Sequence, residues 1–90
     1  MQSELKNKKE ELQILLSKIV KEKRQNLHKS ITLISNEICM TKSMWGDLER
    51  GKKDPQLSTI WRISEALEIP LSSLIWELEQ KLGSNFSLID

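Results

Sequence analysis

The chain has 90 residues, room for one small domain, and its 14 Lys and Arg against 13 Asp and Glu leave a net charge of +1. One cysteine, Cys39, excludes an internal disulfide; with the single His28 it is too few for a protein zinc site, so we expect no metal and no cofactor. No apolar run approaches the roughly 18 residues of a membrane span, no glycine-rich loop could hold a phosphate, and no nucleophile has a base beside it. These exclusions favour a cytoplasmic binding module, with no small-molecule ligand evident, over an enzyme or a membrane protein.

The charges are unevenly distributed along the chain. Residues 1–30 carry eight Lys and Arg against four acids, whereas residues 56–90 carry two against five. The near-zero total therefore hides a basic head and an acidic tail. We expect the acids to lie on the last two helices. We expect a set of basic residues to gather at one end of the domain, and this set consists of Lys21, Lys23, Arg24, Arg50, Lys52 and Lys53.

Apolar residues at helical spacing predict a long first helix from about Ser3, its candidate cap, to Arg24. Its apolar stripe includes Leu5, Leu12, Leu16 and Ile19. Two uses of this helix stay open: packing on the domain as an amphipathic helix, or binding a second copy or a partner as an arm. We take residues 1–19 as an N-terminal helical extension, residues 20–82 as the domain and residues 83–90 as a C-terminal tail.

Two short helices, Ser30–Ile38 and Thr41–Arg50, follow with a tight turn at Cys39–Met40 between them. Each begins with a hydroxyl residue that suits an N-cap. Gly51 ends the second helix, since a glycine just past the last turn adopts the left-handed conformation. The inward-facing pair of the second helix is Trp45 and Leu48.

The second half of the chain predicts two more helices. Ser58 is the expected cap of the first, and Pro70 starts the last, which Gly83 terminates. The apolar stripe of the first consists of Ile60, Trp61, Ile63, Ala66 and Leu67. The stripe of the last consists of Leu71, Leu74, Ile75, Leu78 and Leu82. The sequence thus predicts an all-α fold of five helices.

The pair of short helices has the outline of a helix-turn-helix, in which the second helix enters the major groove and the first braces it. From Arg24 to Ile75 the chain resembles the lambda-repressor-like, or XRE-type (Cro/repressor), helix-turn-helix family. The residues that carry the resemblance are Leu48-Glu49-Arg50-Gly51-Lys52, Asp54-Pro55, Leu57, Ile60, Ile63, Ala66-Leu67, Ile69-Pro70-Leu71 and Leu74-Ile75. It implies a five-helix lambda-repressor-like DNA-binding domain with an extended N-terminal helix.

The resemblance also implies roles for individual residues. Arg24 and Glu49 match the family's buried ion pair, which holds two helices in register. The DNA-binding positions it implies are Ser30, Thr41, Lys42, Ser43, Met44, Asp47, Arg50, Lys52 and Lys53. Among them, Thr41 to Asp47 match positions that face base edges, Asp47 being suited to a cytosine amino group, and the last three match the loop along the sugar-phosphate backbone. From the residues alone, the lysines are also compatible with a solvated surface.

Several residues depart from the family pattern. Ile31 replaces a phosphate-binding glutamine, Leu33 replaces a polar residue, and with Met44 they make the DNA face unusually apolar. Such a patch motivates a second hypothesis, an adaptor or antitoxin that holds a protein partner through this face or through the N-terminal arm. Trp45 beside Gly46 indicates local repacking. Cys39 takes a turn position usually held by glycine, and we expect it to be a small packed residue.

A single module with three or four base contacts binds weakly, and a two-fold dimer solves this by placing recognition helices about 34 Å apart on a near-palindromic site. The last helix offers the surface, with the indole of Trp76 as anchor. The expected dimer residues are Leu71, Ile75, Trp76, Leu78 and Leu82; the alternative is that the protein's own core uses this stripe. The primary hypothesis is a homodimeric repressor- or controller-type transcriptional regulator that binds a specific sequence of double-stranded DNA.

Overall fold

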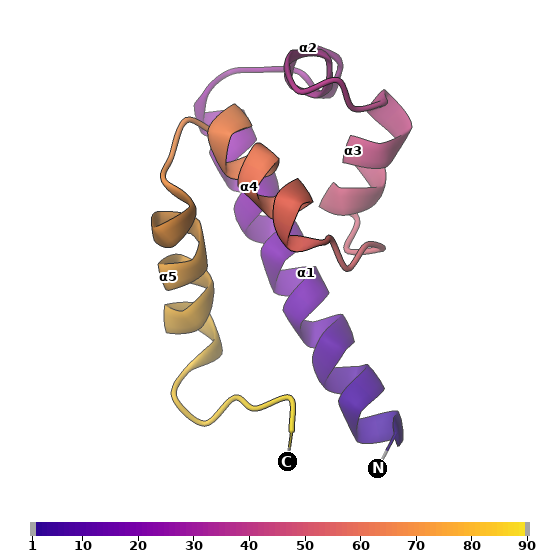
Figure 1. Ribbon diagram of the computed structural model, residues 1–90, viewed down its shortest axis with the longest axis vertical. Coiled ribbons are helices and arrows are strands. Elements are labelled where there is room, and N and C mark those ends of the chain that lie inside the picture. The colour runs from indigo at the N-terminus through magenta and orange to yellow at the C-terminus, as the bar shows by residue number, and fades with distance from the viewer. Residues whose placement is uncertain (1, 90) are drawn as a thin grey trace.

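The computed structural model describes residues 2–89, and within them the chain forms five α-helices and no strand. The helices are α1 (Gln2–Asn26), α2 (Ile31–Glu37), α3 (Lys42–Glu49), α4 (Leu57–Ala66) and α5 (Leu71–Leu82). Helices α3 and α5 pack on α1, α2 packs on α3, and α4 packs on α5 (Figure 1). The expected all-α fold of five helices is confirmed.

Helix α1 is the longest element, and its N-terminal turns extend past the other helices (Figure 1). It begins before Ser3, which lies inside the first turn and is therefore not its cap. Leu5 is 42% exposed although it belongs to the expected apolar stripe, because the buried core starts only at Leu16. Despite the 25 residues of α1, no helix in the described part of the chain is long and apolar enough to cross a membrane.

Both short helices carry the N-caps expected from the sequence. The Leu33 amide donates to Ser30 Oγ at 3.0 Å, and the Met44 amide donates to Thr41 Oγ1 at 3.0 Å. Between them the chain turns at Cys39, whose φ of 55° is the left-handed conformation that glycine adopts most easily. The Cys39 side chain is exposed, so the expectation that it is packed was wrong.

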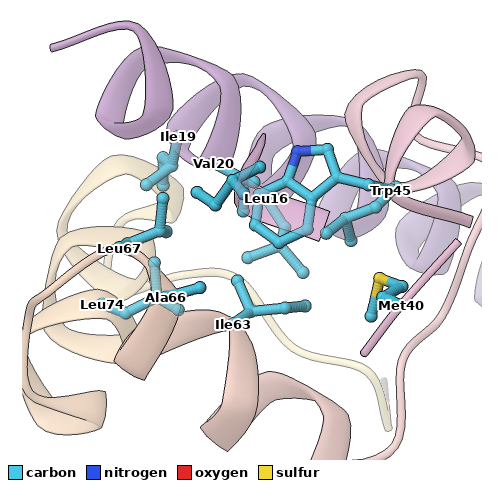
Figure 2. Close-up of a cluster of buried hydrophobic side chains, with 11 residues drawn as sticks. Leu16, Ile19, Val20, Met40, Trp45, Ile63, Ala66, Leu67 and Leu74 are labelled. Atoms are coloured by element: carbon cyan, nitrogen blue, oxygen red, sulfur yellow. The ribbon is translucent and has the colours of Figure 1, made fainter. Parts of the chain in front are cut away.

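The core lies where α1, α3 and α4 meet, and Trp45 of α3 fills its centre. Its side chain is fully buried and points toward Leu16 and Val20 of α1 (Figure 2). Ile63 of α4 and Leu74 of α5 close the core from the other side. The inward position expected for Trp45 is therefore confirmed, and the indole fixes the distance at which α3 packs on α1.

Helix α4 differs in two respects from its prediction. It begins at Leu57, with Gln56 in the N-cap position and no side-chain cap, so Ser58 lies inside the helix and does not cap it. Trp61 is 55% exposed, not buried. At about 100° per residue, Trp61 lies nearly opposite Ile63, the buried centre of the helix, so one apolar stripe cannot contain both.

Candidate nucleic-acid interface

The exposed side of α3 is a direct consequence of what its other side buries. Trp45, Gly46 and Leu48 are buried. The residues left on the outside are Lys42, Ser43, Met44, Asp47 and Arg50, of which Asp47 is half-buried and the others are exposed. We call this set the α3 face. The Thr41 and Ser30 hydroxyls, also expected to meet DNA, already accept the capping hydrogen bonds of α3 and α2.

An ion pair fixes the C-terminal end of α3 on α1. Arg24 Nε donates to Glu49 Oε2 at 2.5 Å and Arg24 Nη2 donates to Glu49 Oε1 at 2.9 Å, the bidentate geometry that suits a guanidinium and a carboxylate. The two side chains are only 12% and 6% exposed. The hydrogen bond to Glu49 raises the pKa of Arg24, with the attraction of the Glu49 charge adding to it and burial opposing it.

Two further groups complete this buried network. Trp45 Nε1 donates to Glu49 Oε2 at 2.5 Å, and Arg24 Nη1 donates to the Lys29 carbonyl oxygen at 2.9 Å. Glu49 therefore receives three hydrogen bonds, and the guanidinium joins α1, α3 and the connection before α2. The two side chains that the family resemblance pairs thus lie in contact, and the indole hydrogen bond to Glu49 is an addition that the sequence did not suggest.

Lys29 and Arg62, to which the sequence assigned no functional role, connect α2 with α4 and with the residues that follow α4. Lys29 Nζ lies 3.0 Å from Glu37 of α2 and 3.5 Å from Glu68, and the hydrogen bond to Glu37 is the main cause of its raised pKa. Arg62 of α4 donates to the Ile38 carbonyl oxygen at the end of α2. Local sequence carries no signal for these contacts, because each joins residues that are distant along the chain or on different elements.

The loop after α3 runs close to α1. Gly51 has a φ of 73°, as expected, and a Cβ added to it would lie 3.2 Å from Ile14 Cα. This approach fixes the loop, and the side chains of Lys52 and Lys53 are exposed just beyond it. Both lysines therefore follow directly after a glycine that packs against α1.

Arg50 does not extend into this loop. Its guanidinium folds back along α3 and its Nη2 donates to Asp47 Oδ1. A Cβ added to Gly46 would lie 3.1 Å from Arg50 Nη1, so Arg50, and not the neighbouring indole of Trp45, fills the space that the glycine leaves.

The apolar residues expected on this side of the molecule separate into two groups. Leu33 and Met44 are 49% and 50% exposed, whereas Ile31 is half-buried and packs against the core. The apolar patch is therefore smaller than the sequence indicated.

The expected gathering of basic residues is incomplete, because Lys23 Nζ lies 3.0 Å from Glu77 of α5. This lysine neutralises an acid of the last helix instead of adding to the charge near Lys52 and Lys53.

On α5, only one of the residues expected in a dimer interface is well exposed. Trp76 is 62% exposed and lines a shallow pocket with Lys23, Ser72, Ser73 and Glu77. The other four are half-buried in this single chain: Leu71, Ile75, Leu78 and Leu82. Leu78 packs against the core, so part of the stripe serves the protein's own interior.

One known protein is similar to this chain in sequence and another in structure. The chain is 32% identical to the HTH-type transcriptional regulator SutR of Escherichia coli K12 over 66 residues, which is 73% of this chain and 37% of that protein. The crystal structure of an HTH_3 family transcriptional regulator from Vibrio cholerae matches with a TM-score of 0.73 and 26% identity, over 91% of this chain and 46% of the other. The chain thus spans less than half the length of either relative.

The family model described as helix-turn-helix, HTH_3, matches residues 20–74, the segment that runs from the last two turns of α1 to the first turn of α5. This segment contains the capped helix pair, the buried ion pair and the α3 face. The chain therefore belongs to the HTH_3 helix-turn-helix family, the XRE or lambda-repressor-like family that its sequence resembles.

Proposed function

We propose that this chain is a sequence-specific DNA-binding regulator of transcription, with residues 20–82 as its DNA-binding unit. The observation that carries the proposal is the N-terminal part of the α3 face, where Thr41 caps the helix and the side chains of Lys42 and Ser43 are exposed. Lysine and serine side chains at the start of a recognition helix suit base edges in the major groove. The two regulators to which the chain is similar support this function.

The backbone-binding part of the proposed site is the loop that follows α3. Lys52 and Lys53 are exposed, and the contact of Gly51 with α1 supports the loop. Each lysine that neutralises a phosphate releases counterions, so the slope of log K against log[salt] becomes steeper by about 0.9 per phosphate contact. Because Lys52 and Lys53 are the exposed basic residues of this loop, we expect a small number of such contacts per chain.

A homodimer on a near-palindromic operator completes the proposal, because one α3 face reads too few base pairs to specify a site. Trp76 supports α5 as the dimer surface, since a large exposed indole beside a shallow pocket is a suitable interface anchor. Sedimentation equilibrium measures the oligomeric state of the intact chain and of Trp76→Ala. A wild-type chain that stays monomeric at about 50 μM would refute the α5 dimer.

Selection of bound sites from random duplex DNA, followed by mobility shifts at several salt concentrations, tests the DNA-binding function. We expect one enriched, near-palindromic sequence and an affinity that falls steeply with salt. Combined Lys42→Ala and Ser43→Ala should abolish the preference for that sequence while circular dichroism shows an intact fold. A protein that binds the selected and a scrambled duplex equally would contradict the proposal.

A second candidate function rests on the exposed Leu33 and Met44, which are unusual on a DNA-facing surface. It is an adaptor or antitoxin that holds a protein partner through this face. Leu33→Ser separates the two functions, because Leu33 belongs to the exposed apolar pair but not to the α3 face. DNA binding should survive this change nearly unaltered if the α3 face binds DNA, whereas a partner complex isolated with the wild type should be lost if the apolar pair binds a protein.

A further inference from the structure

The middle of α3 contains a glycine, a residue that a helix interior disfavours. A Cβ built on Gly46 would lie 3.1 Å from Nη1, 3.6 Å from Nη2 and 3.7 Å from Cζ of Arg50, which are its three nearest neighbours. The guanidinium of Arg50 therefore rests on the helix backbone where any other residue would place a side chain.

Asp47 holds the guanidinium in this position. Its Oδ1 accepts a hydrogen bond from Arg50 Nη2, and the two side chains are 29% and 56% exposed. Among the described residues, Asp47 is the hydrogen-bond acceptor of the Arg50 side chain. An arginine has five N–H donors, so most of them stay available on the exposed side of α3.

We infer that Arg50, seated on Gly46 and held by Asp47, reads a guanine in the major groove; the inference rests on the DNA-binding function proposed above. A guanidinium pairs with the O6 and N7 acceptors of guanine through two parallel N–H bonds. Asp47 is then a positioning residue. This differs from the family resemblance, which gives Asp47 a cytosine amino group and Arg50 the sugar-phosphate backbone.

Charge favours guanine over phosphate as the partner of Arg50. The Asp47 carboxylate is in contact with the guanidinium, so a phosphate bound there would meet a second negative charge, whereas the guanine edge is neutral. The position of Arg50 on α3 also agrees with guanine as its partner. Ser43, Asp47 and Arg50 follow one another at intervals of four and three residues, so they lie on one side of α3.

Arg50→Lys is the decisive variant, because lysine keeps the charge but loses the two-pronged donor geometry. Sites are selected from random duplex DNA with the wild type and with the variant. We expect the wild-type site to contain a guanine whose replacement weakens binding about 5- to 150-fold, and we expect Arg50→Lys to lose this preference. The slope of log K against log[salt] should stay the same in Arg50→Lys.

Two further variants test the seat and the positioning residue. Asp47→Ala and Gly46→Ala should relax the preference at the same base pair that Arg50→Lys affects, while thermal unfolding shows that Gly46→Ala is folded. Lys53→Met is the matched control, since removal of a backbone contact should weaken binding to all sequences and reduce the salt slope by about 0.9.

Three results would overturn the inference. Arg50→Lys could keep every base preference of the wild type, or Arg50→Ala could behave like Lys53→Met, which would assign Arg50 to a phosphate. Asp47→Ala could relax a cytosine preference at a different base pair, which would make Asp47 a base reader. A wild type that selects no sequence would contradict the proposed function as well, so the two failures are distinguishable.

Discussion

Removal of Glu49 should destabilise the fold far more than loss of a surface ion pair. With Glu49→Leu, the guanidinium of Arg24, only 12% exposed, loses two hydrogen bonds, and Trp45 Nε1 loses its acceptor. Loss of one partner from a buried ion pair costs about 3–5 kcal/mol, because an uncompensated charge stays behind. A domain of this size has a free energy of unfolding of about 5–15 kcal/mol, so the loss is a large fraction of the total stability.

Urea unfolding followed by circular dichroism measures this effect. With an m-value of about 1–1.5 kcal/mol/M for a small domain, the midpoint of Glu49→Leu should fall by about 2 M or more. Arg24→Met and the double variant complete a double-mutant cycle. The double variant should be less destabilised than the sum of the two single changes, because it leaves no unpaired charge.

The Lys9–Asp54 pair is the matched control. Its atoms lie 3.6 Å apart and its side chains are 49% and 58% exposed, so Asp54→Ala should cost less than about 1 kcal/mol. If Glu49→Leu cost no more than Asp54→Ala, or if the Arg24 and Glu49 changes were additive, the buried network would not hold α3 on α1 and the reasoning would be refuted.

Gly51→Ala should destabilise the protein by about 2 kcal/mol or more, because it combines a left-handed φ of 73° with a Cβ only 3.2 Å from Ile14 Cα. Gly46→Ala should have no effect or stabilise the fold by up to about 1 kcal/mol, since only the mobile end of Arg50 must shift, and thermal unfolding compares the two. Contact with Glu37 raises the pKa of Lys29 above its ordinary value of 10.5, so its stabilising effect should be complete below pH 10.5 and disappear as the pH rises through the folded-state pKa. The stability difference between wild type and Lys29→Met should therefore shrink only at strongly alkaline pH, and a difference that grew there would contradict the assignment.

Local signals in the sequence were sufficient for much of the fold and for the outline of the site. Ser30 and Thr41 mark two helix starts because their hydroxyls satisfy amides within the same turn, and Gly51 marks a helix end because its conformation is intrinsic to the residue. The exposed start of α3 follows from the same local pattern. Ser58 failed as a cap because an N-cap also needs the chain to enter the helix at that residue, and α4 begins one residue earlier.

Only the tertiary structure decided which side chains meet across elements. Neither spacing nor composition places Lys29 between Glu37 and Glu68, or Lys23 on Glu77. The pairing of Arg50 with Asp47 over Gly46 is local in sequence, yet a rotamer choice decides it, and the pattern of residue types is the same for either rotamer.

The composition argued against an internal disulfide and a protein zinc site, and the order of apolar residues indicated five helices, because both depend on residue type and on spacing within one element. The net charge of +1, uninformative as a sum, acquired its meaning from the folded chain. Folding places Lys23 against an acid of α5, buries Arg24 on Glu49, and leaves Lys52 and Lys53 exposed beside α3. Which charges stay available to a partner depends on distances between helices, and these are fixed only when the core around Trp45 is packed.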